Sequence, residues 1–243
     1  MPGRVAFVCA MPMELTPLKK KLSLKKTKLG SLDAYQGALG QSQVVAIVTG
    51  MGTRLATEGL EHLLQQVELA RVVVVGITGA IENETPIGTI VFPELVVDGA
   101  TGEGYRPEQI TQALPTGKMW TSDVLITDPD RIAGLQADGV VALDMETAAL
   151  ARISERHQIP WSVFRAISDR ASDGSLDEEV FQMSNQDGTL NAKSVASFFV
   201  RHPGRLPAMA RLSKGARLAA DRAASAAVDA VARLEQTGIA EAR

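Results

Sequence analysis

Two buried strands with a helix between them limit the fold of this chain more than any other feature. Residues 140–143 and 161–167 are mainly apolar and rich in branched side chains, as expected of strands buried on both faces. The stretch between them repeats apolar residues at the spacing of one helix face, at Ala149, Leu150 and Ile153. The pattern predicts strand, helix and strand within an α/β domain.

A carboxylate lies where each of these strands ends. Asp144 is a suitable helix N-cap, and Glu146 would occupy the first turn of a helix that ends near His157. Asp169 follows the second strand directly after Ser168. Ligands bind beyond the carboxyl ends of the strands in an open parallel sheet, so we expect Glu146 and Asp169 to face one crevice.

Two further strands are expected earlier in the chain. Residues 5–9 form a compact apolar run, and Pro12 favours the start of a helix that carries Glu14. Residues 71–75 are the most β-rich run and lead into residues 76–80, which we expect to form a turn. Taken without any relative, Glu14 is interpreted as a surface acid in the first helical turn.

The remaining pattern of the first half predicts a hairpin and two helices. Residues 31–39 and 42–48 predict paired strands that turn at Gly40, and residues 53–66 predict a helix. The helix from Glu14 is expected to present a solvated basic face. That face would carry Lys19, Lys20, Lys21, Lys25, Lys26 and Lys28.

Length and composition agree with one large α/β domain. The chain has 243 residues, of which 45% are hydrophobic, so a full core is expected. No run approaches the roughly 18–20 consecutive apolar residues of a membrane span. The first strand begins without a signal-peptide pattern, and we therefore expect a cytoplasmic protein.

The sequence offers no motif for a metal or a cofactor. His62, His157 and His202 are far apart, and none is paired with Cys or Glu at ligand spacing. No phosphate-binding loop or dinucleotide-binding glycine motif occurs. Cys9 lies at the end of an apolar run and is expected to be a small buried residue. We expect neither metal nor cofactor.

Charge is distributed unevenly along the chain. Residues 1–28 carry a net charge of +6 and residues 201–243 a net charge of +4, which leaves −13 for the middle because the total is −3. An acidic body disfavours nucleic-acid binding. The two basic ends remain candidates for contact with an anionic surface, including a membrane.

Two motifs stand at the strand ends, D-M-E-T-A-A at residues 144–149 and F-R-A-I-S-D at residues 164–169. Together they resemble the nucleoside phosphorylase superfamily, most closely its hydrolytic branch, the 5′-methylthioadenosine/S-adenosylhomocysteine nucleosidases. The segment A-M-P-M-E at residues 10–14 is similar to the one that opens these enzymes. The resemblance implies a single three-layer α/β/α domain with a central mixed sheet. It also implies hydrolysis of a 5′-substituted adenosine to release adenine.

The resemblance assigns roles to the matching residues. Asp169 would be the general acid that protonates the purine at N7, and Glu14 the general base that activates water. Glu146 would bind the ribose hydroxyls, and Arg165 would orient Glu14 and the water. The implied substrate-binding residues are Thr78, Gly79, Ala80, Leu125, Ile126, Met145 and Ser168.

The choice between water and phosphate as nucleophile depends on nearby cations. A phosphorylase needs several donors around an anion, and the sequence offers Arg165 and, less readily, Arg54. Hydrolysis is therefore favoured, because Glu14 can serve as a base. A purine nucleoside phosphorylase is kept as an alternative.

The chain departs from the family at several positions. Ala80 replaces a glycine, Leu125 replaces an aromatic residue that would stack on the base, and the segment between Gly79 and Glu146 is short. These departures and the basic C-terminal helix also resemble hopanoid-associated nucleosidases that release adenine from adenosylhopane. A non-catalytic nucleoside-binding paralogue is the third interpretation.

The C-terminal part is predicted to be largely helical. Residues 174–191 are expected to form a loop, residues 192–200 a helix, and residues 205–234 a longer helix. We expect a nucleoside phosphorylase-like domain over residues 1–200 and a helical extension over residues 201–243. The extension would pack on the domain, on a second subunit or on a membrane surface. Family members are usually oligomeric, so a homodimer is expected.

Overall fold

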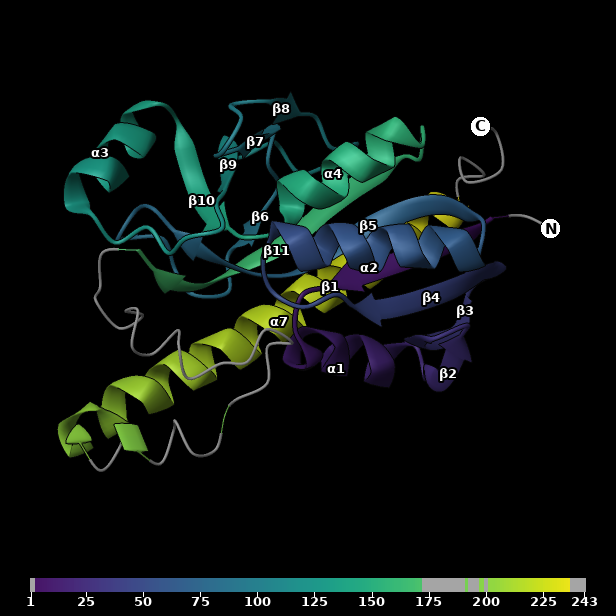
Figure 1. Cartoon of the computed structure of the whole chain (residues 1–243), viewed down its shortest axis with the longest axis horizontal. Helices are drawn as coiled ribbons and strands as arrows, with labels where there is room; N and C mark the ends of the chain where they lie inside the picture. Colours follow the sequence, from purple (N-terminus) through teal and green to yellow (C-terminus); the bar gives the residue numbers. More distant parts are fainter. Residues whose placement is uncertain (1–2, 172–190, 192–196, 199–200, 237–243) are drawn as a thin grey trace.

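The computed structural model describes residues 3–171, 191, 197–198 and 201–236. A central mixed β-sheet is covered by helices on both faces (Figure 1). Helices α2 (Thr53–Gln66) and α4 (Thr147–Arg156) pack on one face. Helices α1 (Pro12–Lys21) and α7 (Leu206–Gln236) pack on the other face. The predicted three-layer α/β/α architecture is confirmed.

The central strand is β5 (Leu69–Ala80), which pairs in parallel with β1 and β11 and antiparallel with β10. Val72 and Val74 face the α2 and α4 layer, whereas Val73 and Val75 face the α1 and α7 layer. Branched side chains on both faces explain the continuous apolar run. The order is β2-β3-β4-β1-β5-β10-β9-β7-β8, with β11 also paired to β6. The other strands are β1 (Arg4–Cys9), β2 (Lys25–Leu29), β3 (Leu32–Leu39), β4 (Ser42–Val48), β6 (Ile90–Val91), β7 (Leu95–Asp98), β8 (Gly104–Tyr105), β9 (Lys118–Thr121), β10 (Val140–Asp144) and β11 (Trp161–Arg170).

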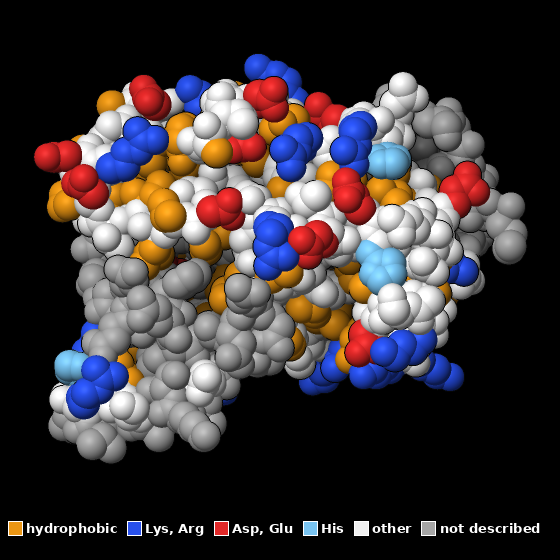
Figure 2. Space-filling model, viewed as in Figure 1, with side chains coloured by type: hydrophobic (Ala, Val, Ile, Leu, Met, Phe, Trp, Pro, Cys, Tyr) orange, Lys and Arg blue, Asp and Glu red, His pale blue; other side chains and the backbone are white. Residues whose placement is uncertain are grey.

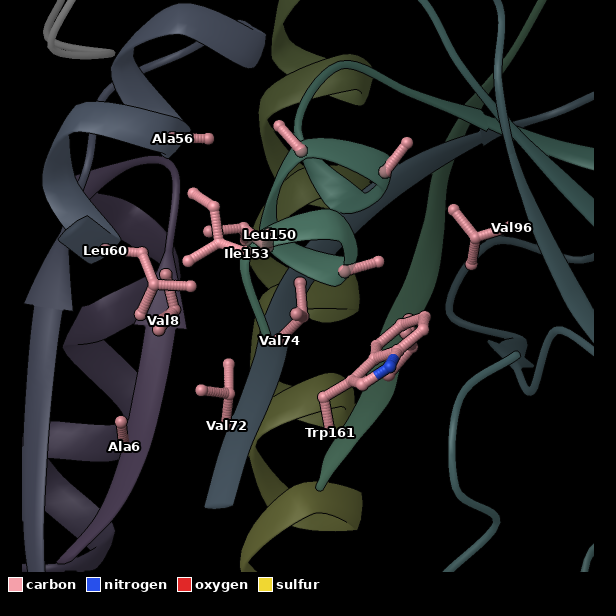
Figure 3. Packing of buried hydrophobic residues seen from close by; sticks show 14 of the residues in the cluster. Ala6, Val8, Ala56, Leu60, Val72, Val74, Val96, Leu150, Ile153 and Trp161 are labelled. Carbon is pink, nitrogen blue, oxygen red and sulfur yellow. The ribbon is translucent and has the colours of Figure 1, made fainter. Parts of the chain in front are cut away.

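The core on the α2 and α4 side joins these two helices to the sheet. Figure 3 shows Leu60 of α2 and Leu150 and Ile153 of α4 gathered over Val8 of β1 and Val74 of β5. All five residues are at most 2% exposed. Each buried aliphatic side chain contributes about 1.5–3 kcal/mol to folding. This cluster holds β1 and β5 in a fixed relation to α4.

Helix α7 approaches the sheet closely because its inner face consists of small residues. At Gly215 an added Cβ would lie 2.8 Å from the carbonyl oxygen of Ser168. The helix predicted over residues 205–234 is confirmed, and a short 3-10 turn, η1 (Pro203–Arg205), precedes it. The division of the chain at residue 200 stays a prediction. The buried face of α7 contains Ala219, Ala220, Ala223, Ala224, Ala227, Ala230 and Val231.

The N-terminal lysines do not all lie on one helix, so that prediction is wrong. The chain turns at Ser23, whose φ of 50° lies in the left-handed region, and then enters β2. Lys25, Lys26 and Lys28 therefore lie on an edge strand that pairs with β3. The lysine-rich sequence gave no apolar alternation, and this strand is formed by pairing with its neighbour.

Two further differences concern the centre of the chain. The expected turn over residues 76–80 continues as strand, because Gly76 to Ala80 pair with β11. Helix α3 (Pro129–Ala137) was not predicted; Asp128 caps it by accepting a 3.0 Å hydrogen bond from the backbone of Asp130. Apart from residues 191 and 197–198, the loop expected over 174–191 and the helix expected over 192–200 lie outside the described residues. Within the described part, no helix is long and apolar enough to cross a bilayer.

Candidate active site

A cavity of about 470 Å³ opens where the carboxyl ends of β1, β5, β10 and β11 come together. Four ionisable candidates from three segments line it: Glu14, Glu146, Arg165 and Asp169. A larger open groove lies at the opposite edge of the sheet, where a buried ion pair joins Arg71 to a partly buried acid. None of the four candidate residues lines that groove, so the smaller cavity is the candidate site.

Arg165 is the hub of the site and is shared by three carboxylates. Its Nη2 lies 2.8 Å from Asp144 Oδ2 and 3.0 Å from Glu146 Oε2. Its Nη1 lies 3.8 Å from Glu14 Oε1 and donates a 2.8 Å hydrogen bond to the carbonyl oxygen of Ile77. All four of these charged groups are buried, so three buried carboxylates share one buried guanidinium.

Glu14 is fully buried, which corrects its interpretation as a surface acid. Its Oε2 accepts hydrogen bonds from the backbone N–H groups of Ala10 and Met11 at 2.8 and 2.9 Å. Its Oε1 accepts from the N–H of Ile77 at 2.8 Å. Burial raises the pKa of Glu14, although Arg165 and these N–H groups act in the opposite direction.

Gly76 provides the space in which Glu14 and Arg165 meet. An added Cβ at Gly76 would overlap Glu14 Oε1, and it would lie 2.7 Å from Glu14 Cδ and 2.9 Å from Arg165 Nη1. The residue lies inside β5 with no unusual backbone angle. The glycine is therefore needed for close approach of side chains, a reason that strand patterning alone does not reveal.

Glu146 connects the turn before α2 to Arg165. Its Oε1 accepts a 2.9 Å hydrogen bond from the N–H of Gly52. Burial raises the pKa of Glu146 to about 7; Arg165 opposes this shift, whereas the negative charges of Asp144 and Glu14 add to it. A carboxyl with such a pKa changes its protonation state near neutral pH.

Asp144 has a larger role than the predicted helix cap. The helix begins at Thr147 with Glu146 at the N-cap position, so the expected boundary was early. Asp144 Oδ2 accepts hydrogen bonds from the backbone N–H groups of Glu146 and Thr147, and Oδ1 accepts from Thr121 Oγ1 at 2.6 Å. Asp144 therefore ties β9, β10 and the start of α4 to Arg165.

Asp169 lies near the end of β11 and lines the cavity. Ser168 Oγ donates a short hydrogen bond to Asp169 Oδ1, and it lies 3.3 Å from the carbonyl oxygen of Thr78. The absence of a side chain at Gly79 leaves room for Asp169 Oδ2. The hydroxyl of Thr78 donates to the carbonyl oxygen of Leu143 at 2.6 Å, so toward a ligand it can act only as an acceptor.

The structure brings nearly all predicted substrate-binding residues to the cavity wall. Ala80 is the exception: its side chain is fully buried in the core, because β5 has passed the cavity and pairs there with β10. Arg54 does not line the cavity either; it is exposed and pairs with Glu58 at 2.8 Å. The predicted residues that line the cavity are Thr78, Gly79, Leu125, Ile126, Met145 and Ser168.

Part of the cavity wall comes from residues that sequence reasoning missed. Helix α7 contributes Met209, Leu212 and Arg217, and the end of β11 contributes Arg170. No pattern linked α7 to the site, because more than thirty residues separate it from β11 in the chain. Within the described residues, no group of His, Cys, Asp and Glu side chains is arranged to hold a metal.

The sequence is similar to those of several nucleosidases. A 5′-methylthioadenosine/S-adenosylhomocysteine nucleosidase of Psychromonas ingrahamii is 26% identical over 200 residues, which cover 69% of this chain and 86% of the relative. The Neisseria meningitidis nucleosidase of the same name, solved with methylthio-immucillin-A, has a TM-score of 0.73 at 17% identity and covers 96% of this chain and 100% of that one.

A second solved structure adds to this comparison. Futalosine hydrolase of Helicobacter pylori has a TM-score of 0.72 at 14% identity and covers 96% of this chain and 99% of that one. These likenesses confirm the predicted fold. The sequence model of the phosphorylase superfamily matches residues 4–115 and 100–201, most of the chain. This protein belongs to the phosphorylase superfamily.

Proposed function

We propose that the protein is a nucleosidase that hydrolyses the N-glycosidic bond of a 5′-substituted adenosine and releases adenine. The observation that carries this proposal is that Glu14, Glu146 and Asp169 line one cavity, in which Arg165 pairs with Glu14 and Glu146. The nucleosidases among the relatives support the same reaction class. Cleavage of this bond needs an acid for the leaving base, a stabilised sugar cation and a positioned nucleophile.

Asp169 acts as the general acid in this proposal. The carboxyl group donates its proton to purine N7, which turns adenine into a neutral leaving group as the bond to the sugar breaks. Ser168 holds one carboxyl oxygen of Asp169 in a fixed orientation. The proton is available only if closure around a bound substrate removes water from Asp169, because desolvation favours the neutral acid.

Glu14 and Glu146 act on the sugar side. Glu14 accepts a proton from the attacking water, and the burial that raises its pKa makes it a stronger base. Glu146 accepts hydrogen bonds from the ribose hydroxyls, and in its ionised form it favours the developing positive charge. Arg165 holds both carboxylates and limits their mutual repulsion.

Adenine release from methylthioadenosine tests the proposal, with and without phosphate in the buffer. We expect release in phosphate-free buffer, and a loss of kcat of about 10²–10⁴-fold in Asp169→Asn. Release that requires phosphate would make the protein a phosphorylase, in which Arg170 and Arg217 of the cavity wall would be candidates for holding the anion. A protein that binds the nucleoside but releases no adenine from any 5′-substituted adenosine would be a binding paralogue.

The apolar part of the cavity favours a second candidate substrate. Met209 and Leu212 of α7 and Leu125 line it, and Val124 at its wall is 70% exposed. Such a wall suits a large apolar 5′ group, as in adenosylhopane. Adenine release from detergent-dispersed adenosylhopane that exceeds release from methylthioadenosine would favour this substrate. Cleavage of methylthioadenosine alone would exclude it.

We also propose that the protein works in the cytoplasm as a homodimer, for which the family resemblance is the support. Light scattering coupled to size exclusion measures the mass of the assembly directly. A homodimer has twice the chain mass of 25.8 kDa. A single species at the chain mass would contradict the proposal.

A further inference from the structure

The two basic ends of the chain lie side by side in the folded protein. Helix α1, near the N-terminus, packs along α7, near the C-terminus, and both cover the same face of the sheet (Figure 1). An ion pair of 3.3 Å joins Lys21 Nζ to Asp221 Oδ1. The N-terminal segment of net charge +6 and the C-terminal segment of net charge +4 thus lie together. The acidic middle of the chain forms much of the remaining protein.

Exposed cations from both ends form what we call the basic face. Among the described residues of α1, β2 and α7 as far as residue 220, the one acid is the buried Glu14. Asp221, at the middle of α7, pairs with Lys21. Nearby, Asp33 pairs with Lys26 and Lys28, which leaves a clear excess of cations. In Figure 2 basic side chains gather at the lower right, where Figure 1 shows α1 and β2, whereas acidic and basic side chains alternate over the upper half. The basic face comprises Lys20, Lys21, Lys25, Lys26, Lys28, Arg211 and Lys214.

The first half of α7 also exposes apolar side chains. Leu206 and Leu218 are 50% and 42% exposed. Leu218 follows Lys214 by four residues and Arg211 by seven, so the three share one side of the helix. Leucines beside cations on one helix are typical of segments that lie at a membrane interface, where cations meet lipid headgroups and apolar groups enter the acyl boundary.

We propose that the basic face docks the protein on an anionic lipid bilayer, with the first half of α7 at the contact. A nucleic acid would use the cations but not the exposed leucines, and the acidic body would repel it. The opposite side of the same half-helix lines the cavity with Met209 and Leu212. Docking would therefore place one wall of the active site at the lipid surface.

Vesicle co-sedimentation of the full chain tests the docking. Neutral phosphatidylcholine vesicles are compared with vesicles that contain about 30 mol% phosphatidylglycerol, at about 50 and about 500 mM NaCl. We expect binding to the anionic vesicles at low salt to be at least about ten-fold stronger than to neutral vesicles, and to be largely lost at high salt. Failure to bind anionic vesicles at low salt would overturn the proposal.

Charge reversal at either end should weaken the binding, because the two ends form one face. We expect Lys20→Glu/Lys25→Glu and Arg211→Glu/Lys214→Glu each to reduce it about five-fold or more. The four residues do not line the cavity, so thermal unfolding and release of adenine from a water-soluble substrate should be unchanged. The matched control Arg106→Glu/Arg152→Glu reverses two exposed charges near β8 and on α4 and should leave binding unchanged.

Three outcomes would contradict a shared lipid-binding face. Sensitivity to one double variant alone would show that the ends do not act together. An equal loss of vesicle binding in the control variant would show that binding depends only on the net charge of the protein. The third outcome is that the protein binds RNA more tightly than anionic vesicles, and that Leu206→Ser/Leu218→Ser changes neither affinity. The face would then be a general polyanion site. Because binding is measured without substrate, the result is independent of the proposed hydrolysis.

Discussion

Arg165 is one cation among three buried carboxylates, and this imbalance makes the site sensitive to pH. The pKa of Glu146 is raised to about 7, and the pKa of Glu14 is raised as well. A carboxyl whose pKa is higher in the folded than in the unfolded protein stabilises the fold below its unfolded pKa. That stabilisation is lost as pH rises through the folded value. The site is thus expected to favour folding more at mildly acidic than at neutral pH.

Glu146→Gln should remove this contribution. Urea unfolding at about pH 5 and pH 7.5 should show that wild type loses about 1–3 kcal/mol more stability over this interval than the variant does. Asp144→Asn should also lose less stability than wild type between these two pH values, because the charge of Asp144 helps to raise the pKa of Glu146. An identical pH dependence in wild type and Glu146→Gln would contradict the assignment.

Gly76→Ala should damage the site with the fold retained. The added methyl group overlaps the carboxylate of Glu14 and presses on Arg165, and both side chains are buried with little room to move. We expect a loss of about 10–100-fold in kcat, because small misplacements of catalytic groups are costly. Activity equal to wild type would contradict the proposed positions of Glu14 and Arg165.

The matched control is Gly134→Ala in α3. No atom lies within 4 Å of an added Cβ at Gly134, so this change should leave activity unchanged. Alanine in a helix should stabilise the protein by about 0.5–1 kcal/mol relative to glycine. The opposite signs of the two glycine substitutions separate close packing at the site from a general effect of glycine.

At the scale of elements, the close packing of α7 on the sheet depends on the small size of its inner residues. Ala223 is fully buried against the sheet side that also holds α1. Ala223→Leu should lower the free energy of unfolding by about 1–3 kcal/mol, because the larger side chain forces the helix away from the sheet. Ala210→Leu, at an exposed position of the same helix, should change it by less than about 0.5 kcal/mol. Urea unfolding of both variants measures the difference.

Elements with strong apolar periodicity were predictable from the sequence. Helix α2 and the hairpin of β3 and β4 were expected within a residue of their observed bounds. β2 was missed because Lys25, Lys26 and Lys28 carry no apolar alternation and its pairing with β3 creates the strand. The prediction that residues 76–80 turn was wrong because two neighbouring strands hold Gly76 and Gly79 in the sheet.

At the scale of the whole molecule, the candidate site joins segments that are far apart in the chain. Glu146 and Asp169 were expected in one crevice because each follows a buried strand, whereas Glu14 was assigned to the site only through the family resemblance. The wall from α7 and the contact of Asp144 with Arg165 were not, since they depend on tertiary packing. Sequence reasoning thus identified the groups proposed for chemistry better than the surfaces proposed for substrate selection.

The most direct test of the account is the fate of the sugar when the reaction runs in water labelled with heavy oxygen. Methylthioadenosine is incubated with the enzyme in phosphate-free and in phosphate buffer, and the sugar product is analysed by mass spectrometry. Activation of water by Glu14 predicts free methylthioribose that carries one heavy oxygen atom in both buffers. A sugar phosphate without label, formed only when phosphate is present, would contradict hydrolysis and the role of Glu14.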